Sequence, residues 1–142
     1  MRRIDIYFLL LATILLLGGA GLGIKMGVSE DFQLAPVHAH INLVGWASLA
    51  LFGLVYRAYP KLAERKLALV HFILSSSSAI LLPLGIGFAI LRNQPAIAIV
   101  ASLLWVGGVL VFLAQLISLL REPAHESQPE ARAPSRKFSA KA

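Results

Sequence analysis

The sequence predicts an all-α membrane protein, a bundle of four transmembrane helices, and composition is the first reason. Hydrophobic residues make up 58% of the chain and charged residues 14%. A soluble domain contains about 45–50% apolar and about 25% charged residues. A small globule has too much surface for its volume to bury so many apolar side chains, so the surplus is expected to face lipid.

The second reason is a set of four apolar stretches, each near the roughly 20 residues that a helix needs to cross a bilayer. They run over about 6–24, 36–56, 67–91 and 96–120, and together form a predicted domain over 1–120. Gly27, Pro60 and Pro95 lie in the joints, where helix ends are expected. Pro36 and Pro95 suit the first turn of a helix.

The first stretch follows Arg2 and Arg3, as the apolar core of a signal peptide does. Its apolar run is longer than a usual signal core and lacks an Ala-X-Ala cleavage site, which favours a retained helix. The residues 121–142 are charged, broken by prolines and poor in large apolar side chains. We therefore expect a disordered tail whose basic end contacts anionic lipid.

The positive charges of the loops predict the orientation. They are concentrated before the first helix, in the second loop and in the tail, at Arg2, Arg3, Arg57, Lys61, Arg65, Lys66, Arg121, Arg132, Arg136, Lys137 and Lys141. The first and third loops hold only Lys25 and Arg92. The positive-inside rule then places both termini in the cytoplasm of a multi-pass protein, which we assign to a bacterial inner membrane. The net charge of +6 lies in these loops and the tail, which indicates lipid rather than nucleic acid as the partner.

The second stretch carries the chemically most informative feature, the pair His38 and His40. Ionisable groups inside a membrane are costly, so each is a functional candidate. At about 100° per residue the two rings lie about 200° apart on a helix, which disfavours joint binding of one ion and suits two separate partners. The alternative is that either histidine reaches the membrane interface without a ligand.

The two faces of this helix differ in polarity. The His38 face continues through Asn42, Gly45, Leu49, Phe52 and Tyr56, whereas the His40 face is apolar, with Val44, Ala47, Leu51 and Leu54. Asn42 and Tyr56 are candidates for supporting a ligand or bonding another helix. The glycine permits close approach by a neighbouring helix or a flat ligand.

A polar strip on the third stretch consists of His71, Ser75 and Ser78, which share a face expected to turn inward. The alternative for His71 is a packed histidine bonded to a serine, with the serines bonding carbonyls of the preceding turn near Pro83. At about 1.5 Å per residue His71 lies roughly 20 Å from the histidine pair, so they should not share a metal. Gln115 on the fourth stretch suits a hydrogen bond between helices.

The run from His38 to Trp46, continuing to Gly53, Tyr56 and Pro60, resembles the tenth helix of the catalytic subunit of haem-copper oxidases, most closely the C-family. The Val70-His71-Phe72 segment resembles the start of the next helix there. The resemblance covers about a third of the chain and extends to small membrane proteins that carry the same motif. It implies that His38 and His40 each bind a haem iron.

The chain also departs from that family. The first and fourth stretches contain no histidine, so the second low-spin ligand and the copper-binding triad are missing and a complete oxidase is not indicated. The resemblance therefore implies a b-type haem protein for electron transfer, haem handling or gas sensing, with haem shared between copies of the chain. The alternatives are a haem-free accessory or assembly subunit of a respiratory complex, and a divalent metal site at His38 or His40. With no cysteine, thiolate metal sites and disulfides are excluded.

Overall fold

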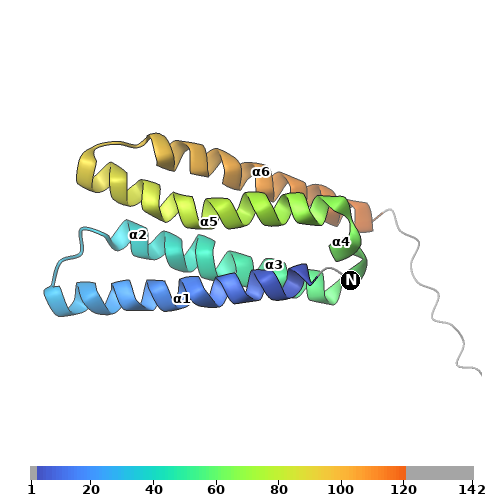
Figure 1. The fold of residues 1–142 in the computed structure, drawn as a ribbon, viewed down its shortest axis with the longest axis horizontal. Coiled ribbons are helices and arrows are strands. Elements are labelled where there is room, and N and C mark those ends of the chain that lie inside the picture. Colours follow the sequence, from blue (N-terminus) through green and yellow to red (C-terminus); the bar gives the residue numbers. More distant parts are fainter. Residues whose placement is uncertain (1–2, 121–142) are drawn as a thin grey trace, which may run out of the picture.

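The computed structural model describes residues 3–120, and every regular element there is a helix (Figure 1). In chain order these are α1 (Ile4–Ser29), α2 (Ala35–His40), η1 (Ile41–Ser48), α3 (Leu49–Ala58), α4 (Pro60–Glu64), α5 (Lys66–Arg92) and α6 (Ala96–Leu119). Four helical spans are long and apolar enough to cross a membrane, with α2, η1 and α3 forming one of them. The prediction of an all-α protein with four such helices is confirmed, whereas the tail 121–142 lies outside the described residues.

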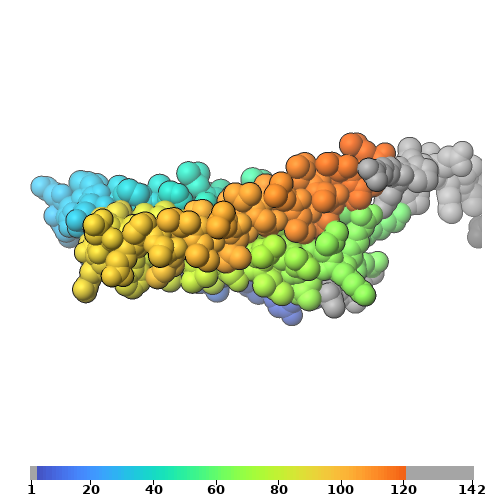
Figure 2. Space-filling model, turned by 90° about the horizontal axis from the view of Figure 1, so that it is seen from above, coloured from blue at the N-terminus to red at the C-terminus, as the bar shows by residue number. Residues whose placement is uncertain are grey.

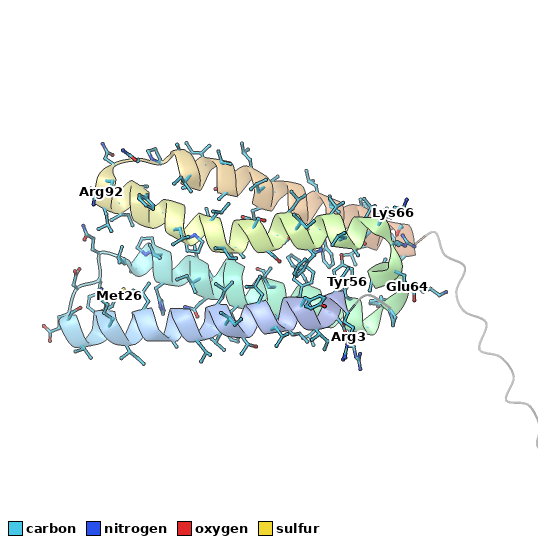
Figure 3. The ribbon with its side chains drawn as sticks, in the orientation of Figure 1. Arg3, Met26, Tyr56, Glu64, Lys66 and Arg92 are labelled. Atoms are coloured by element: carbon cyan, nitrogen blue, oxygen red, sulfur yellow. The ribbon has the colours of Figure 1, made fainter. Side chains whose placement is uncertain are left out.

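The two ends of the bundle differ in charge. One end, which we call the basic end, holds Arg3, Arg57, Lys61, Arg65 and Lys66. The other, which we call the opposite end, holds the α1–α2 and α5–α6 connections. Arg3, Glu64 and Lys66 lie together at the basic end, and Met26 and Arg92 lie at the opposite end (Figure 3). The basic end therefore carries more positive charge than the opposite end, where Lys25 and Arg92 are balanced by Glu30 and Asp31.

The second span is not a uniform α-helix, because η1 is a π-helix. The widened turn is visible in a side-chain bond as well, since the Ser48 hydroxyl donates to the Leu43 carbonyl, five residues earlier, at 2.8 Å. α-Helical spacing was expected throughout this span, and that expectation is wrong over Ile41–Ser48. Single π turns are rare and are frequently found at functional sites.

The first helix continues past Gly27, which was expected to lie in a joint. A Cβ at Gly27 would meet nothing within 4 Å, and α1 ends two residues later at Ser29. Glu30 then adopts a left-handed conformation with φ 52°, and the Asp31 side chain accepts a bond from the Gln33 backbone N–H at 3.0 Å. The stop signal is thus the polar sequence Ser29–Asp31 rather than the glycine.

Small residues allow the helices to approach closely. A Cβ at Gly85 of α5 would lie 2.4 Å from the Ala98 backbone nitrogen, and one at Gly108 of α6 would lie 2.6 Å from the Ser75 hydroxyl. Helix α6 accordingly lies along α5, as Figure 2 shows from outside. Without a hydrophobic driving force in lipid, such close packing is a main source of helix association.

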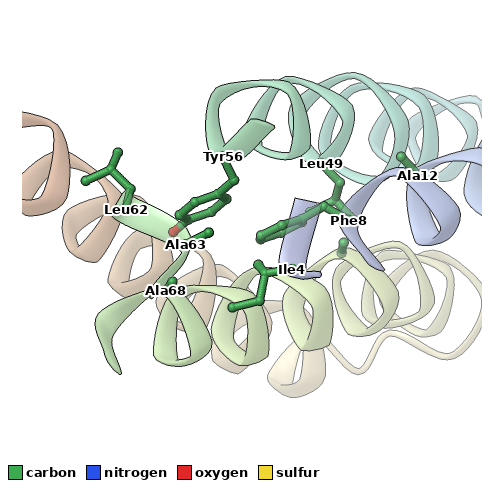
Figure 4. Close-up of a cluster of buried hydrophobic side chains, with 9 residues drawn as sticks. Ile4, Phe8, Ala12, Leu49, Tyr56, Leu62, Ala63 and Ala68 are labelled. Atoms are coloured by element: carbon green, nitrogen blue, oxygen red, sulfur yellow. The ribbon is translucent and has the colours of Figure 1, made fainter. Parts of the chain in front are cut away.

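The buried apolar cluster lies towards the basic end. Phe8 of α1 is fully buried there and stacks on Tyr56 of α3, with ring centroids 5.7 Å apart. Leu62 and Ala63 of the short helix α4 cover this cluster from the connection (Figure 4). The consequence is that a polar side chain in this region is enclosed from several directions.

Candidate functional site

His38 is held against α1 by its own ring. Its Nδ1 lies 2.9 Å from the carbonyl oxygen of Gly19. Because a carbonyl only accepts, Nδ1 must carry a hydrogen, and in the neutral ring the lone pair is then on Nε2. A Cβ at Gly23 would lie 2.8 Å from Cε1 of this ring, so only glycine leaves room for it there.

Asn42 of η1 packs against α1 beside His38. Its Nδ2 donates to the His38 carbonyl at 2.8 Å, and a Cβ at Gly19 would lie 2.7 Å from that same nitrogen. Gly19 and Gly23 thus form a notch, here called the glycine notch, that receives His38 and Asn42. Gly45 leaves room for the Leu15 side chain of α1, since a Cβ there would lie 2.9 Å from Cδ1 of Leu15.

His40 has different surroundings. Its Nδ1 donates to the Pro36 carbonyl one turn earlier at 2.8 Å, in an exposed bond, whereas the His38 bond is partly buried. Leu51 and Leu54, which α-helical spacing would place on its face, are 61% and 54% exposed, but the π-helix lies between them and His40, and Val44 of the same expected face packs against the buried cluster. The pair therefore has one ring against α1 and one whose bond is exposed.

Tyr56 takes part in a second polar group, far from the pair. Its hydroxyl lies 2.9 Å from Nδ1 of His71 and accepts a bond from Nε2 of Gln115 at 2.8 Å. These three side chains, which we call the buried triad, join α3, α5 and α6, and all are buried. The expected interhelical bonds of Tyr56 and Gln115 are present.

The structure corrects the expected role of the serines. His71 bonds to Tyr56 rather than to a serine, because Tyr56 reaches it from the facing helix. Ser78 donates to the Ala101 carbonyl on α6 at 2.7 Å instead of to the preceding turn of its own helix. The strip of His71, Ser75 and Ser78 does turn inward, with each residue fully buried.

Aromatic rings enclose the imidazole of His71. Phe112 of α6 stacks on it with centroids 4.9 Å apart, and Phe52 and Phe8 lie at 4.6 and 5.3 Å. The faces of the imidazole are thus already covered by side chains. A macrocycle as large as haem does not fit beside His71 in this packing.

Some polar atoms of this region have no partner among the described residues 3–120. They are Nε2 of His71, Oε1 of Gln115 and the hydroxyls of Ser75 and Ser76. All are buried, where most polar groups find a protein or water partner. These unpartnered atoms indicate that a further hydrogen-bonding group binds near the buried triad.

An ion pair that the sequence analysis missed lies at the basic end. Asp5 of α1 accepts from Arg57 of α3 at 3.3 Å, and both line a pocket of about 470 Å³ together with Arg3, Tyr56, Pro60, Ala63 and Glu64. Asp5 could have been noticed as an acid in the first helical turn, at the end where Arg57 was expected. Tyr56 thus contributes both to this pocket and to the buried triad.

No group of three or more His, Cys, Asp or Glu side chains is arranged for a metal ion within residues 3–120. His38 and His40 lie near the opposite end and His71 near the basic end, so the structure does not bring the three histidines together. A metal at His38 or His40 would therefore need ligands from outside this part of the chain. Comparisons with family models, curated proteins and solved structures find no match for this chain.

Proposed function

We propose that this chain is a multi-pass protein of a bacterial inner membrane that binds b-type haem through His40 at the outer end of the bundle. Electron transfer, haem handling and gas sensing are the activities that such a site would serve. The observation that carries the proposal is the bond from Nδ1 of His40 to the Pro36 carbonyl at 2.8 Å. In the neutral ring this bond leaves the lone pair on Nε2.

This bond is the arrangement that histidine ligands normally use. A ligating imidazole donates its other N–H to a carbonyl or carboxylate, which fixes the ring and its tautomer. Exposed apolar side chains of the same membrane span, including Leu51, suit the apolar surroundings that tune a haem. When bound, the haem would supply one-electron or gas-binding chemistry, and the chain would supply a ligand and a low-dielectric surface.

His38 is the weaker ligand candidate. It shares the Nδ1–carbonyl bond, but its ring sits in the glycine notch, so a second haem at Nε2 would require α1 to move away. Asn42 and Gly45 are likewise engaged with α1, and Tyr56 with the buried triad. The proposal therefore keeps His40 as the ligand and gives the others packing roles.

The second axial ligand is the reason to propose a homo-oligomer. Within residues 3–120, the only histidine besides this pair is His71, near the basic end. A His40 from a second copy of the chain would complete a two-histidine site between the two copies. We accordingly expect one haem for two chains.

The decisive measurement is the reduced-minus-oxidised spectrum of the protein, purified after expression with ample haem. We expect a Soret band and a b-type difference spectrum, with a haem content near half the chain concentration. A well-folded protein without a Soret band would overturn the haem proposal.

A haem-free accessory or assembly subunit of a respiratory complex is the second candidate. It is favoured by one observation, that His38 and Asn42 of the motif are both engaged in contacts with α1. If the chain has this role, His40→Ala should not change its capture of a respiratory partner. A divalent metal at His40 would instead appear in elemental analysis of protein purified without a histidine tag.

A further inference from the structure

The buried triad has a definite hydrogen-bond direction. Nε2 of Gln115 is an amide nitrogen and only donates, so its bond of 2.8 Å makes the Tyr56 oxygen an acceptor. The hydroxyl hydrogen of Tyr56 is then free to point at Nδ1 of His71, 2.9 Å away. Nδ1 must accept, and a neutral His71 carries its hydrogen on Nε2.

This direction leaves one donor and one acceptor of the buried triad unmatched. Nε2–H of His71 has no acceptor and Oε1 of Gln115 has no donor within residues 3–120. Both belong to residues joined through the same tyrosine oxygen, and Phe112, one turn before Gln115, stacks on the His71 ring. The unmatched Ser75 hydroxyl lies one turn further along α5, on the same helical face as His71.

We propose that these atoms bind an internal water molecule within the membrane. The water accepts from Nε2–H of His71 and donates to Oε1 of Gln115, and its other hydrogen reaches the Ser75 hydroxyl. A buried water normally makes about three hydrogen bonds, which matches the three unmatched groups. Gly108 supports the site because any Cβ there would lie 2.6 Å from that hydroxyl.

The buried triad borders a pocket at the basic end. Tyr56, a member of the triad, also lines the pocket that Asp5 and Arg57 line. The charged side chains of Asp5 on α1 and Arg57 on α3, which line this pocket, are paired with each other. We therefore expect this water to exchange with solvent. The Nε2 hydrogen of His71 then exchanges through it, one hydrogen leaving the ring as another returns.

Nitrogen-15 NMR of the full chain, labelled on histidine and held in lipid nanodiscs, tests this inference. We expect His71, assigned with His71→Gln, to carry its hydrogen on Nε2 and to show a cross-peak between that hydrogen and water. A hydrogen on Nδ1, or an Nε2 hydrogen that is protected from D₂O for days and gives no water cross-peak, would overturn it.

Gln115→Leu removes the acceptor and replaces it with an apolar side chain of similar size. We expect the water cross-peak of His71 to fall at least tenfold, and the matched control Asn42→Leu, in the glycine notch, to leave it unchanged. An undiminished cross-peak in a folded Gln115→Leu protein would contradict the proposed site. If that variant does not fold, the measurement on the unaltered chain still decides, and neither result depends on whether haem is bound.

Discussion

The two regions that contain histidine differ in what their rings can do. At the opposite end, His38 and His40 each direct Nδ1 at a backbone carbonyl, Gly19 and Pro36 respectively. Near the basic end, His71 directs Nδ1 at a hydroxyl whose own acceptor position is taken by Gln115. The first arrangement leaves a lone pair on Nε2, and the second leaves a hydrogen there.

What a histidine ring can bind at Nε2 depends on the partner of its Nδ1. A lone pair on Nε2 suits a metal or a haem iron, and at His40 the bond that fixes the ring is exposed. A hydrogen on Nε2 suits a water or another acceptor, and at His71 that nitrogen is enclosed by aromatic rings. Mutations at either end should therefore have separable effects.

The largest effect is expected from His40→Ala. If His40 is the haem ligand, this change should remove at least nine-tenths of the haem, measured as Soret absorbance per chain. His38→Ala is the matched comparison, and it should retain more haem because its ring is packed against α1. Equal loss in both variants would contradict the division of roles between the two histidines.

Tyr56→Phe should have the next largest effect. It leaves Nδ1 of His71 and the amide of Gln115 without partners in a buried region. An unsatisfied buried polar group costs about 1–3 kcal/mol, so we expect the free energy of unfolding in detergent to fall by about that amount or more.

Tyr59→Phe is the control for that change, since its ring is exposed at the same end of the chain. Haem content should stay the same in both variants. A loss of haem in Tyr56→Phe at unchanged stability would mean that the buried triad and the haem site are coupled.

The glycine notch permits a finer test within α1. Gly19→Ala places a Cβ 2.7 Å from Nδ2 of Asn42, whereas Gly18→Ala meets nothing within 4 Å. Overpacking costs about 1–3 kcal/mol, and the lower part of this range is expected because the Asn42 amide can shift. Gly18→Ala should stabilise the helix by up to about 1 kcal/mol. Thermal unfolding of the two neighbours in the same detergent would show the opposite signs, and equal shifts would argue against the notch.

The four helices were predictable because apolar length and composition act locally along the chain. The inward turn of His71, Ser75 and Ser78 was predictable for the same reason, since helical periodicity places them on one face. The π-helix over Ile41–Ser48 was not predictable from periodicity, because the α-helical spacing was itself the assumption.

Pairings between helices were harder to predict. Tyr56 and Gln115 each suggested an interhelical bond, but the sequence does not show that both would converge on His71. That convergence depends on how α3, α5 and α6 pack. The occupation of the glycine notch by His38 likewise depends on the register of α1 against α2, which no motif of either helix encodes by itself.

The smallest effect is expected at the Asp5–Arg57 ion pair. The two side chains lie 3.3 Å apart, but that of Arg57 is 72% exposed. Exposed ion pairs contribute about 0–1 kcal/mol and are weakened by salt, so Arg57→Gln should change unfolding stability by less than about 1 kcal/mol. The difference from the unaltered chain should shrink further at high salt. The pair lies beside Tyr56 in the same pocket. A larger and salt-independent loss of stability would therefore mean that Arg57 also supports the buried triad.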